Sequence, residues 1–244
     1  MSADELTPAD PAAVEAALLE GELTLLGRMP WGSNGTFLCE VTAAAGGPPR
    51  RAVYKPRGAE RPLWDFPAGL DRREVAAYEL SRALGWDLVP VTVLREDGPL
   101  GPGSLQDFVD ADFEQHYFTL LEDEAHHDAL RAMCAFDLIG NNTDRKGGHV
   151  LLGRDGRIYG IDHGLMFHHE FKLRTVVWDF AGEPIPSWIR EAAIRLLDDG
   201  LPDRLARHLD ALERDALCTR TRALVAAQTF PVDETGHCYP WPLV

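Results

Sequence analysis

The sequence lacks the features that mark a secreted or membrane-spanning protein. No stretch approaches the about 18 uncharged apolar residues of a transmembrane helix. The first residues hold no basic segment followed by an apolar one, so no signal peptide is expected. The cysteines form no C-x-x-C pair and are too sparse for a disulfide framework; they are Cys39, Cys134, Cys218 and Cys238. These absences predict a cytoplasmic protein with reduced thiols.

Positive charge is also scarce. The chain has 24 Lys and Arg against 39 Asp and Glu, a formal net charge of −15, and no long Lys/Arg cluster. This balance argues against nucleic-acid binding and against stable membrane association, because both partners are anionic. It leaves room for a local basic pocket that holds a phosphate. Hydrophobic residues make up 45% of 244 residues, enough for a real core in one large domain or two small lobes.

Turn signals divide the first half into short β-rich segments around a helix. Strands are expected at 23–29, 35–43, 50–56, 88–96 and 104–110, and the apolar period of 70–86 indicates a helix that Gly85 ends. Asp10 and Pro11 predict another helix over 11–20. In the second half, helical patterns cover 126–140, 186–200 and 202–228, and an irregular, proline-rich tail follows.

This order predicts an α+β fold of two lobes. The expected boundaries are an N-terminal lobe over 1–103, a hinge over 104–112 and a mostly helical C-terminal lobe over 113–244. One hairpin interrupts the helical half, with strands at 149–153 and 157–162 around an Asp-Gly turn.

That hairpin gathers polar side chains at one end. Asp144 precedes its first strand, His149 begins it, and Asp162 ends the second strand. Because the strands pair antiparallel, these three residues should lie at the same end of the hairpin. Carboxylate oxygens beside glycines suit a Mg²⁺ ion that holds nucleotide phosphates. Apolar neighbours on both sides of Asp162 indicate a buried edge, where an unpartnered carboxylate is costly.

Three earlier features fit a phosphate-handling fold. Lys55 lies on an expected strand, and Glu74 lies on the helix that follows, which is the ion-pair arrangement of kinases. One strand earlier, the turn Gly32, Ser33, Asn34 and Gly35 allows the backbone to cover a phosphate. Each feature alone has an ordinary interpretation, as a surface lysine, a solvated glutamate or a hairpin turn. Their occurrence in the order found in kinases favours a nucleotide site.

The segments "GNNTDRKGGHVLL" (140–152) and "GRIYGIDHGLMF" (156–167), with "VYKP" (53–56) and "DRREVAAYELSRALGWDLVP" (71–90), carry a family resemblance. They resemble the phosphatidylinositol 3- and 4-kinase-like family, in particular its bacterial, actinobacterial branch. The resemblance spans about residues 20–230, and its specific motifs lie within 54–90 and 137–167. It implies an atypical kinase fold that uses ATP with Mg²⁺ or Mn²⁺.

The resemblance also implies roles for individual residues. Lys55 would contact the nucleotide phosphates and Glu74 would pair with it, with Glu79 as a rival for that pairing. Asp162 would bind the metal ion. The hinge residues that would hold the adenine through their backbone are Gln106, Asp107, Phe108 and Val109.

The catalytic segment of the resemblance centres on Asp144. This residue would accept or orient the proton of the attacking hydroxyl group. Arg145 or Lys146 would stabilise charge on the transferring phosphoryl group.

Two departures from the family pattern bear on activity. His149 stands where the family has an Asn metal ligand, and imidazole suits Mn²⁺ or Zn²⁺ better than Mg²⁺. The triplet after the second hairpin strand is Asp162-His163-Gly164, with a polar ring in place of Phe. Either the metal set is altered, or catalysis is weakened or lost.

Three functions therefore stay open: an ATP-dependent phosphotransferase, a nucleotide-binding pseudokinase that regulates a partner, and a protein nucleotidyltransferase. The missing Lys/Arg cluster favours a protein or a small polar molecule over a lipid as acceptor. Trp178, Phe180 and Trp188 follow the metal segment. They either line an acceptor cleft or belong to the core, and the core is the more frequent place for such side chains.

Overall fold

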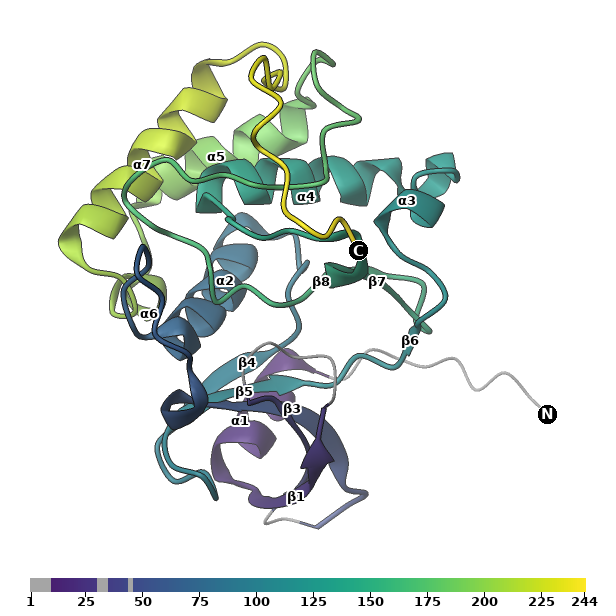
Figure 1. Cartoon of the computed structure of the whole chain (residues 1–244), viewed down its shortest axis with the longest axis vertical. Helices are drawn as coiled ribbons and strands as arrows, with labels where there is room; N and C mark the ends of the chain where they lie inside the picture. The colour runs from purple at the N-terminus through teal and green to yellow at the C-terminus, as the bar shows by residue number, and fades with distance from the viewer. Residues whose placement is uncertain (1–9, 30–34, 44–45) are drawn as a thin grey trace.

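The computed structural model describes residues 10–29, 35–43 and 46–244. A five-stranded sheet forms one end of the molecule and a group of helices forms the other, with a small sheet beside them (Figure 1). The strands are β1 (Glu22–Arg28), β2 (Phe37–Thr42), β3 (Arg50–Pro56), β4 (Thr92–Arg95), β5 (Gly103–Asp107), β6 (Ala111–Asp112), β7 (Val150–Gly153) and β8 (Ile158–Gly160). The helices are α1 (Pro11–Glu20), α2 (Leu70–Leu84), α3 (Tyr117–Leu120), α4 (His127–Gly140), α5 (Ser187–Asp199), α6 (Asp203–Ala206) and α7 (Ala211–Ala226), with short 3₁₀ turns η1 (Arg57–Ala59), η2 (Glu124–His126) and η3 (Gly147–His149).

The large sheet has the strand order β1-β2-β3-β5-β4, and every neighbouring pair is antiparallel. The predicted meander of the first three strands is therefore confirmed. Burial alternates along β3: Ala52, Tyr54 and Pro56 are buried, whereas Val53 and Lys55 on the opposite face are less so. Because side chains alternate between the faces of a strand, this pattern turns Lys55 away from the core that α1 covers.

Helix α2 joins the two ends of the molecule. It is buried along most of its length, and it contacts strands β4 and β5 on one side and helices α5 and α6 on the other. Its residues Ala76, Ala77 and Leu80 belong to the same apolar core as the helices of the other end. Gly85 ends the helix in the left-handed conformation, with φ of 69°, as the sequence predicts. The helix that carries Glu74 is thus held from both sides.

The second half differs from the prediction in three details. Strand β6 joins the expected hairpin to make a three-stranded sheet. His149 lies in the 3₁₀ turn η3 and not on the strand. The helical pattern of 202–228 splits into α6 and α7, because Asp210 and Glu213 form a reciprocal capping box that starts a new helix.

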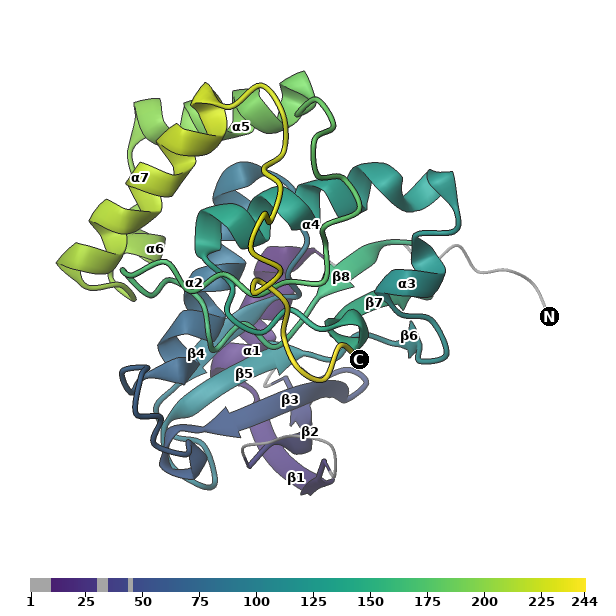
Figure 2. The same cartoon turned by 45° about the horizontal axis from the view of Figure 1, so that its top comes forward.

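The chain thus has the predicted two-lobed α+β fold, with a β-rich lobe and a mostly helical lobe (Figures 1 and 2). Among the residues that the structure describes, no helix has both the length and the apolar character needed to cross a membrane.

Candidate active site

A cavity of about 530 Å³ lies between the two sheets. Strand β3, helix α2 and the end of β5 supply one wall, and the hairpin with the loop before it supplies the other. Ten of the predicted site residues line it: Gly35, Lys55, Glu74, Gln106, Asp107, Phe108, Val109, Asp144, His149 and Asp162. Residues more than a hundred positions apart in the chain therefore meet in one concave site.

Lys55 is the centre of a charged cluster in this cavity. Its ammonium group donates to the Glu74 carboxylate and, at 2.8 Å, to Oδ1 of Asp162. Burial by itself lowers the pKa of Lys55, but the two carboxylates outweigh burial and raise it above the ordinary value. The lysine therefore stays protonated and can offer positive charge to a phosphate.

The partner of Lys55 is Glu74 and not Glu79. Glu74 is buried; one of its oxygens binds Lys55, and the other accepts the backbone N–H of His163 at 3.0 Å. Glu79 lies further along α2 and binds Arg204 at 3.0 Å. The five-residue spacing turns Glu79 to a different face of the helix, because 3.6 residues make one turn.

Asp162 projects from the end of β8 with an exposed carboxylate. Its Oδ2 lies 3.5 Å from Nε2 of His149, and half of its side-chain surface is accessible. The Lys55 ammonium holds the pKa of Asp162 well below its usual range, so the carboxylate is ionised. Its backbone φ of 61° is in the left-handed region, which has a free-energy cost for any residue other than glycine. Residues in such strained conformations occur most often at functional sites.

The glycine of the Asp-His-Gly triplet allows the lobes to approach closely. A Cβ on Gly164 would lie 3.2 Å from Cβ of Leu70 and 3.5 Å from Oε1 of Glu74. Both contacts belong to α2, so this glycine allows the segment after β8 to lie against the helix that carries the Lys55 partner.

A divalent cation fits this site only together with a phosphate. No group of three or more His, Cys, Asp or Glu side chains in the described ranges is placed to hold a metal ion. Asp162 and His149 supply one carboxylate and one imidazole, and burial lowers the pKa of His149, which favours the neutral ring. Cations at nucleotide sites complete their coordination with phosphate oxygens and water. The donor set suits Mn²⁺ better than Mg²⁺.

Asp144 lies on the loop between α4 and η3 and faces the same cavity. Asn142 holds the loop: its side-chain oxygen accepts the backbone N–H of Asp144 at 3.1 Å. Lys146 pairs with Oδ2 of Asp144 at 2.9 Å and does not line the cavity. In this arrangement Lys146 is a neighbour of the candidate base, beside the cavity and not in its wall.

Arg145 is not placed to contact a phosphoryl group, contrary to the expectation from the sequence. Its side chain is completely buried, and its N–H groups donate to Asp137, to the backbone oxygens of His149 and Ile161, and to the ring of His163. These contacts use all five donors of the guanidinium group. Arg145 therefore connects α4 to the two ends of the hairpin without facing the cavity.

Sequence reasoning missed Asp137, the residue on which this buried network depends. Asp137 is fully buried near the end of α4, and its carboxylate accepts from Arg145, from Asn142 at 2.9 Å and from Thr175 at 2.9 Å. It thus ties the loop that carries Asp144 to the segment around Thr175. The signal was available: an Asp within the apolar run "AMCAFDLIG" must find partners if the run is buried.

The end of β5 forms the other end of the cavity. The side chain of Gln106 donates to Thr92 and its backbone belongs to the sheet, while the N–H of Asp107 donates to Val91 and that of Phe108 to Arg51. Within the described residues, no hydrogen bond occupies the backbone of Val109. Phe113, which the sequence analysis did not single out, also lines the cavity.

The predicted glycine turn is only partly visible. Gly35 lines the cavity, whereas Gly32, Ser33 and Asn34 lie outside the described residues.

The irregular C-terminal segment passes beside the loop 141–149, which carries Asp144 (Figures 1 and 2). The backbone N–H of Gly147 donates to the oxygen of Leu243 at 2.7 Å, and Thr175 donates to Cys238 at 2.9 Å. Trp178 also donates to Cys238, through its ring N–H at 3.1 Å. Phe180, by contrast, is a buried core residue, as the more frequent interpretation had it.

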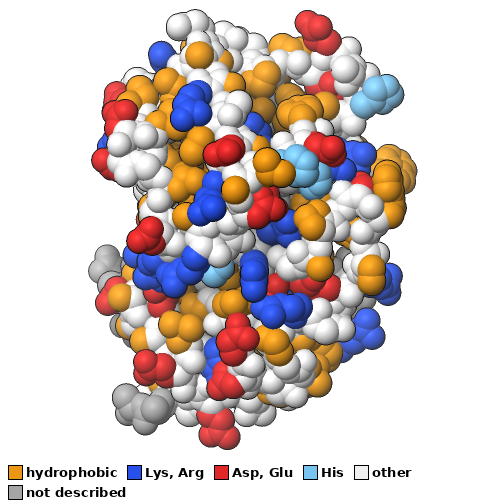
Figure 3. Space-filling view, turned by 90° about the vertical axis from the view of Figure 1, so that its left-hand side faces the viewer, with side chains coloured by type: hydrophobic (Ala, Val, Ile, Leu, Met, Phe, Trp, Pro, Cys, Tyr) orange, Lys and Arg blue, Asp and Glu red, His pale blue; other side chains and the backbone are white. Residues whose placement is uncertain are grey.

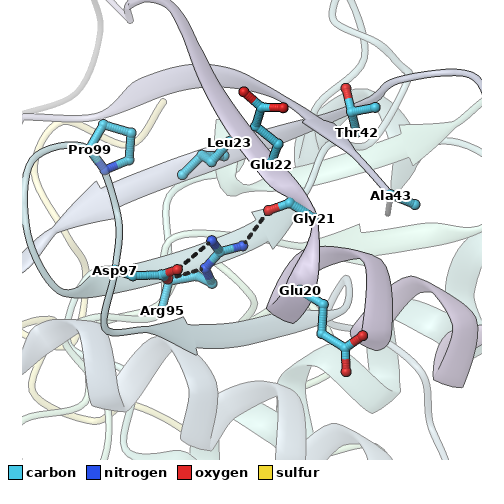
Figure 4. A pocket seen from close by; sticks show the side chains of 9 residues that line it. All are labelled: Glu20, Gly21, Glu22, Leu23, Thr42, Ala43, Arg95, Asp97 and Pro99. Carbon is cyan, nitrogen blue, oxygen red and sulfur yellow. Dashed lines mark hydrogen bonds and ion pairs between the residues drawn. The ribbon is translucent and has the colours of Figure 1, made fainter. Parts of the chain in front are cut away.

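A second hollow, of about 610 Å³, shares no lining residue with the cavity (Figure 4). Its charged centre is Arg95, whose donors already bind Asp97 and the backbone oxygens of Leu18 and Gly21. Four of its five N–H groups are thus occupied, so Arg95 can offer a ligand one donor at most. The larger hollow is therefore a less plausible site than the cavity that holds Lys55.

The net negative charge is not spread evenly over the surface. On the face that carries α2 and α6, Lys and Arg side chains gather in a band across the middle of the molecule (Figure 3). An anionic ligand thus meets positive charge on this face despite the overall charge of −15.

The sequence is similar to that of a mycobacterial protein. The chain is 44% identical over 264 residues to Protein Rv2133c of Mycobacterium tuberculosis, and the match covers 93% of this chain and 94% of that protein. No model of a known protein family matches the sequence.

Solved structures with the same fold include kinases. A Golgi casein kinase with Mn/ADP bound matches with a TM-score of 0.58 and 14% identity, over 96% of this chain and 80% of that one. Another structure of the Golgi casein kinase matches with a TM-score of 0.50 and 15% identity, over 88% and 74%. At such low identity, the likeness establishes the fold alone.

Proposed function

We propose that the chain, which belongs to the same family as the mycobacterial Protein Rv2133c, is an ATP-dependent phosphotransferase of the atypical-kinase type. Its site has the order of parts found in the phosphatidylinositol 3- and 4-kinase-like family. A protein or a small polar molecule is favoured over a lipid as the acceptor, because the sequence lacks a long basic cluster for an anionic headgroup.

One observation carries the proposal. A single lysine binds a glutamate on the helix of the β-rich lobe and an aspartate at the end of the hairpin, and all three face one cavity with Asp144. A half-buried lysine with two carboxylates is more than a sheet needs for stability, because each desolvated charge has a free-energy cost. In kinases the same arrangement neutralises the nucleotide phosphates.

Each residue then has a defined part. Lys55 binds the α- and β-phosphates of ATP, and Glu74 holds the lysine in place. The adenine lies at the end of β5, where the N–H of Val109 donates to its edge and the carbonyl oxygen accepts from it; no bond within the described residues occupies either group. Asp144 accepts or orients the proton of the acceptor hydroxyl group as the γ-phosphoryl group is transferred.

Asp162 and His149 are the residues that would hold Mg²⁺ or Mn²⁺. The ion would neutralise charge on the β- and γ-phosphates when bound. That Mn/ADP occupies a Golgi casein kinase of the same fold supports the choice of ligands.

A nucleotide-binding pseudokinase is the alternative, and His149 in the place of the second metal ligand favours it. Transfer of a nucleotide to a protein is a further possibility, which product mass separates from phosphorylation. Metal-stimulated turnover separates an enzyme from a pseudokinase.

The first test is thermal unfolding with ATP alone, with Mg²⁺ and with Mn²⁺. Binding to the folded state raises the midpoint by mass action. We expect a metal-dependent rise for the wild type that is absent in Lys55→Ala and Asp162→Ala. Glu74→Gln should weaken the response, whereas the matched change Glu79→Gln on the same helix should leave it intact. A wild-type midpoint that no nucleotide moves would refute the proposal.

A further inference from the structure

His163 occupies a buried position between the two halves of the site. Its side chain is completely enclosed, and its ring packs edge-on against Phe136 at 5.6 Å between centroids. Nη2 of Arg145 lies 2.7 Å from Nε2 of the imidazole. A guanidinium group only donates hydrogen bonds, so Nε2 must be the acceptor and the ring proton must lie on Nδ1. The contact therefore needs a neutral imidazole in one tautomer.

The backbone of His163 makes a second link in the opposite direction. Its N–H donates to Oε2 of Glu74 at 3.0 Å, and the other oxygen of Glu74 binds Lys55. The main chain of His163 is thus linked, through Glu74, to Lys55 of the β-rich lobe. Its ring is linked to Arg145 of the loop that carries Asp144, the catalytic loop of the proposed function. Asp162, the candidate metal ligand, is its neighbour in the chain.

Arg145 transmits this link to the candidate base. It follows Asp144 directly, and its backbone N–H and oxygen bind Arg174 and Val176, at 3.0 and 3.1 Å. The four donors that do not reach His163 are already used by Asp137, His149 and Ile161. Without the imidazole acceptor, one buried N–H would have no partner, and the guanidinium group would have to shift to find one.

We propose that His163 is a positioning residue that couples the Lys55–Glu74 pair to the catalytic loop, so that the nucleotide-binding half and Asp144 are held in register. This inference rests on the proposed function and adds a role for the ring that distinguishes the Asp-His-Gly triplet. A Phe side chain would fill the same space but has no acceptor for Arg145.

The test compares His163→Gln with His163→Leu. Glutamine supplies an amide oxygen that can accept from Arg145, whereas leucine fills part of the space without an acceptor. Both variants keep the backbone N–H that binds Glu74. We expect His163→Leu to bind ATP with a Kd within about threefold of the wild type, while kcat for release of ADP from ATP with Mn²⁺ falls about 10- to 100-fold, because Arg145 shifts to find an acceptor and moves the loop of Asp144 with it. His163→Gln should stay within about threefold of the wild type in both quantities.

The rate of amide hydrogen exchange at Arg145 and Val176 is a second measurement of the coupling, and it does not require turnover. Arg145 and Val176 do not line the cavity, so a nucleotide protects their amides only through the protein. ATP with Mn²⁺ should slow their exchange in the wild type and in His163→Gln, but not in His163→Leu.

Other results would overturn the inference. Equal kcat and equal protection in His163→Leu and the wild type would show that the link carries no coupling. Parallel loss of ATP binding and kcat in both variants would make His163 a residue of the fold alone. A wild type that binds no nucleotide would remove the proposed function and the coupling together, whereas the first two results leave the proposed function standing.

Discussion

Two clusters of charge lie side by side in this molecule, and each is built around one cation. Lys55 binds Glu74 and Asp162 at the wall of a cavity, where half of the Asp162 side chain is accessible. Arg145 binds Asp137 where neither side chain has any accessible surface.

The two clusters differ in how far water and ligands can reach them, and this difference indicates which cluster can bind a ligand and which holds the surrounding segments in place. The Lys55 cluster keeps an accessible carboxylate and a strongly protonated lysine, both available to a ligand. The Arg145 cluster has every guanidinium donor occupied, so it can bind nothing further, but it ties three chain segments together. Accessible charges can contact a ligand, whereas enclosed charges fix the positions of the neighbouring loops. Three changes test this comparison, and a fourth tests a histidine outside both clusters.

The largest effect on stability is expected from Asp137→Ala. Removing one partner of a buried pair leaves Arg145 uncompensated, which costs about 3–5 kcal/mol of unfolding free energy. Urea unfolding measures the loss. Asp128→Ala, at an exposed position near the start of the same helix, should change the value by less than about 0.5 kcal/mol. Similar losses in the two variants would contradict the role of Asp137.

A smaller loss is expected from Thr175→Val, which keeps the shape of the side chain. The hydroxyl group donates to Asp137 at 2.9 Å and accepts from the amide of Val177 at 3.1 Å. Losing both buried contacts should cost about 1–3 kcal/mol. Thr219→Val, on the exposed side of α7, is the control. An unchanged urea midpoint for Thr175→Val would mean that the network tolerates a missing member.

Lys55→Met should shift the balance, with a smaller effect on stability than Asp137→Ala and a large effect on ligand binding. The Asp162 carboxylate regains water, but Glu74 is buried and keeps only the amide of His163, so the unfolding free energy should fall by about 1–3 kcal/mol. The rise in midpoint with ATP and metal should disappear. Lys172→Met, which breaks a pair with Asp65 outside the cavity, should keep that rise. Nucleotide stabilisation that survives in Lys55→Met would remove the lysine from the site.

The smallest effect concerns pH. Burial, with the nearby cations Arg207 and Arg72, lowers the pKa of His208 to about 4. Between its ordinary value of about 6.5 and about 4, the unfolded chain binds a proton that the folded chain does not. Stability should therefore fall as pH is lowered through this range. His208→Gln should flatten that part of the curve of unfolding free energy against pH, and an unaltered slope would count against the shift.

The sequence predicted the parts of the site better than their connections. Lys55, Glu74, Asp144 and Asp162 were recognisable from residue type, local period and order, because these signals lie within short segments. The role expected of Arg145 was wrong, because its side chain points into the protein and not into the cavity. The local sequence "TDRKGG" does not determine to which side a loop residue directs its side chain.

What the sequence by itself determined is therefore local: the alternation that turns Lys55 out of the core, the helix of Glu74 with its glycine stop, and the hairpin that places Asp162. What only the tertiary structure decided is which groups face the cavity and which are enclosed. Contacts between segments far apart in the chain pair Lys55 with Glu74 and Glu79 with Arg204. Such contacts also hold the Arg145 side chain against His163, away from the cavity. Such contacts depend on how lobes and loops pack. A buried charge is stable only where that packing brings it a partner.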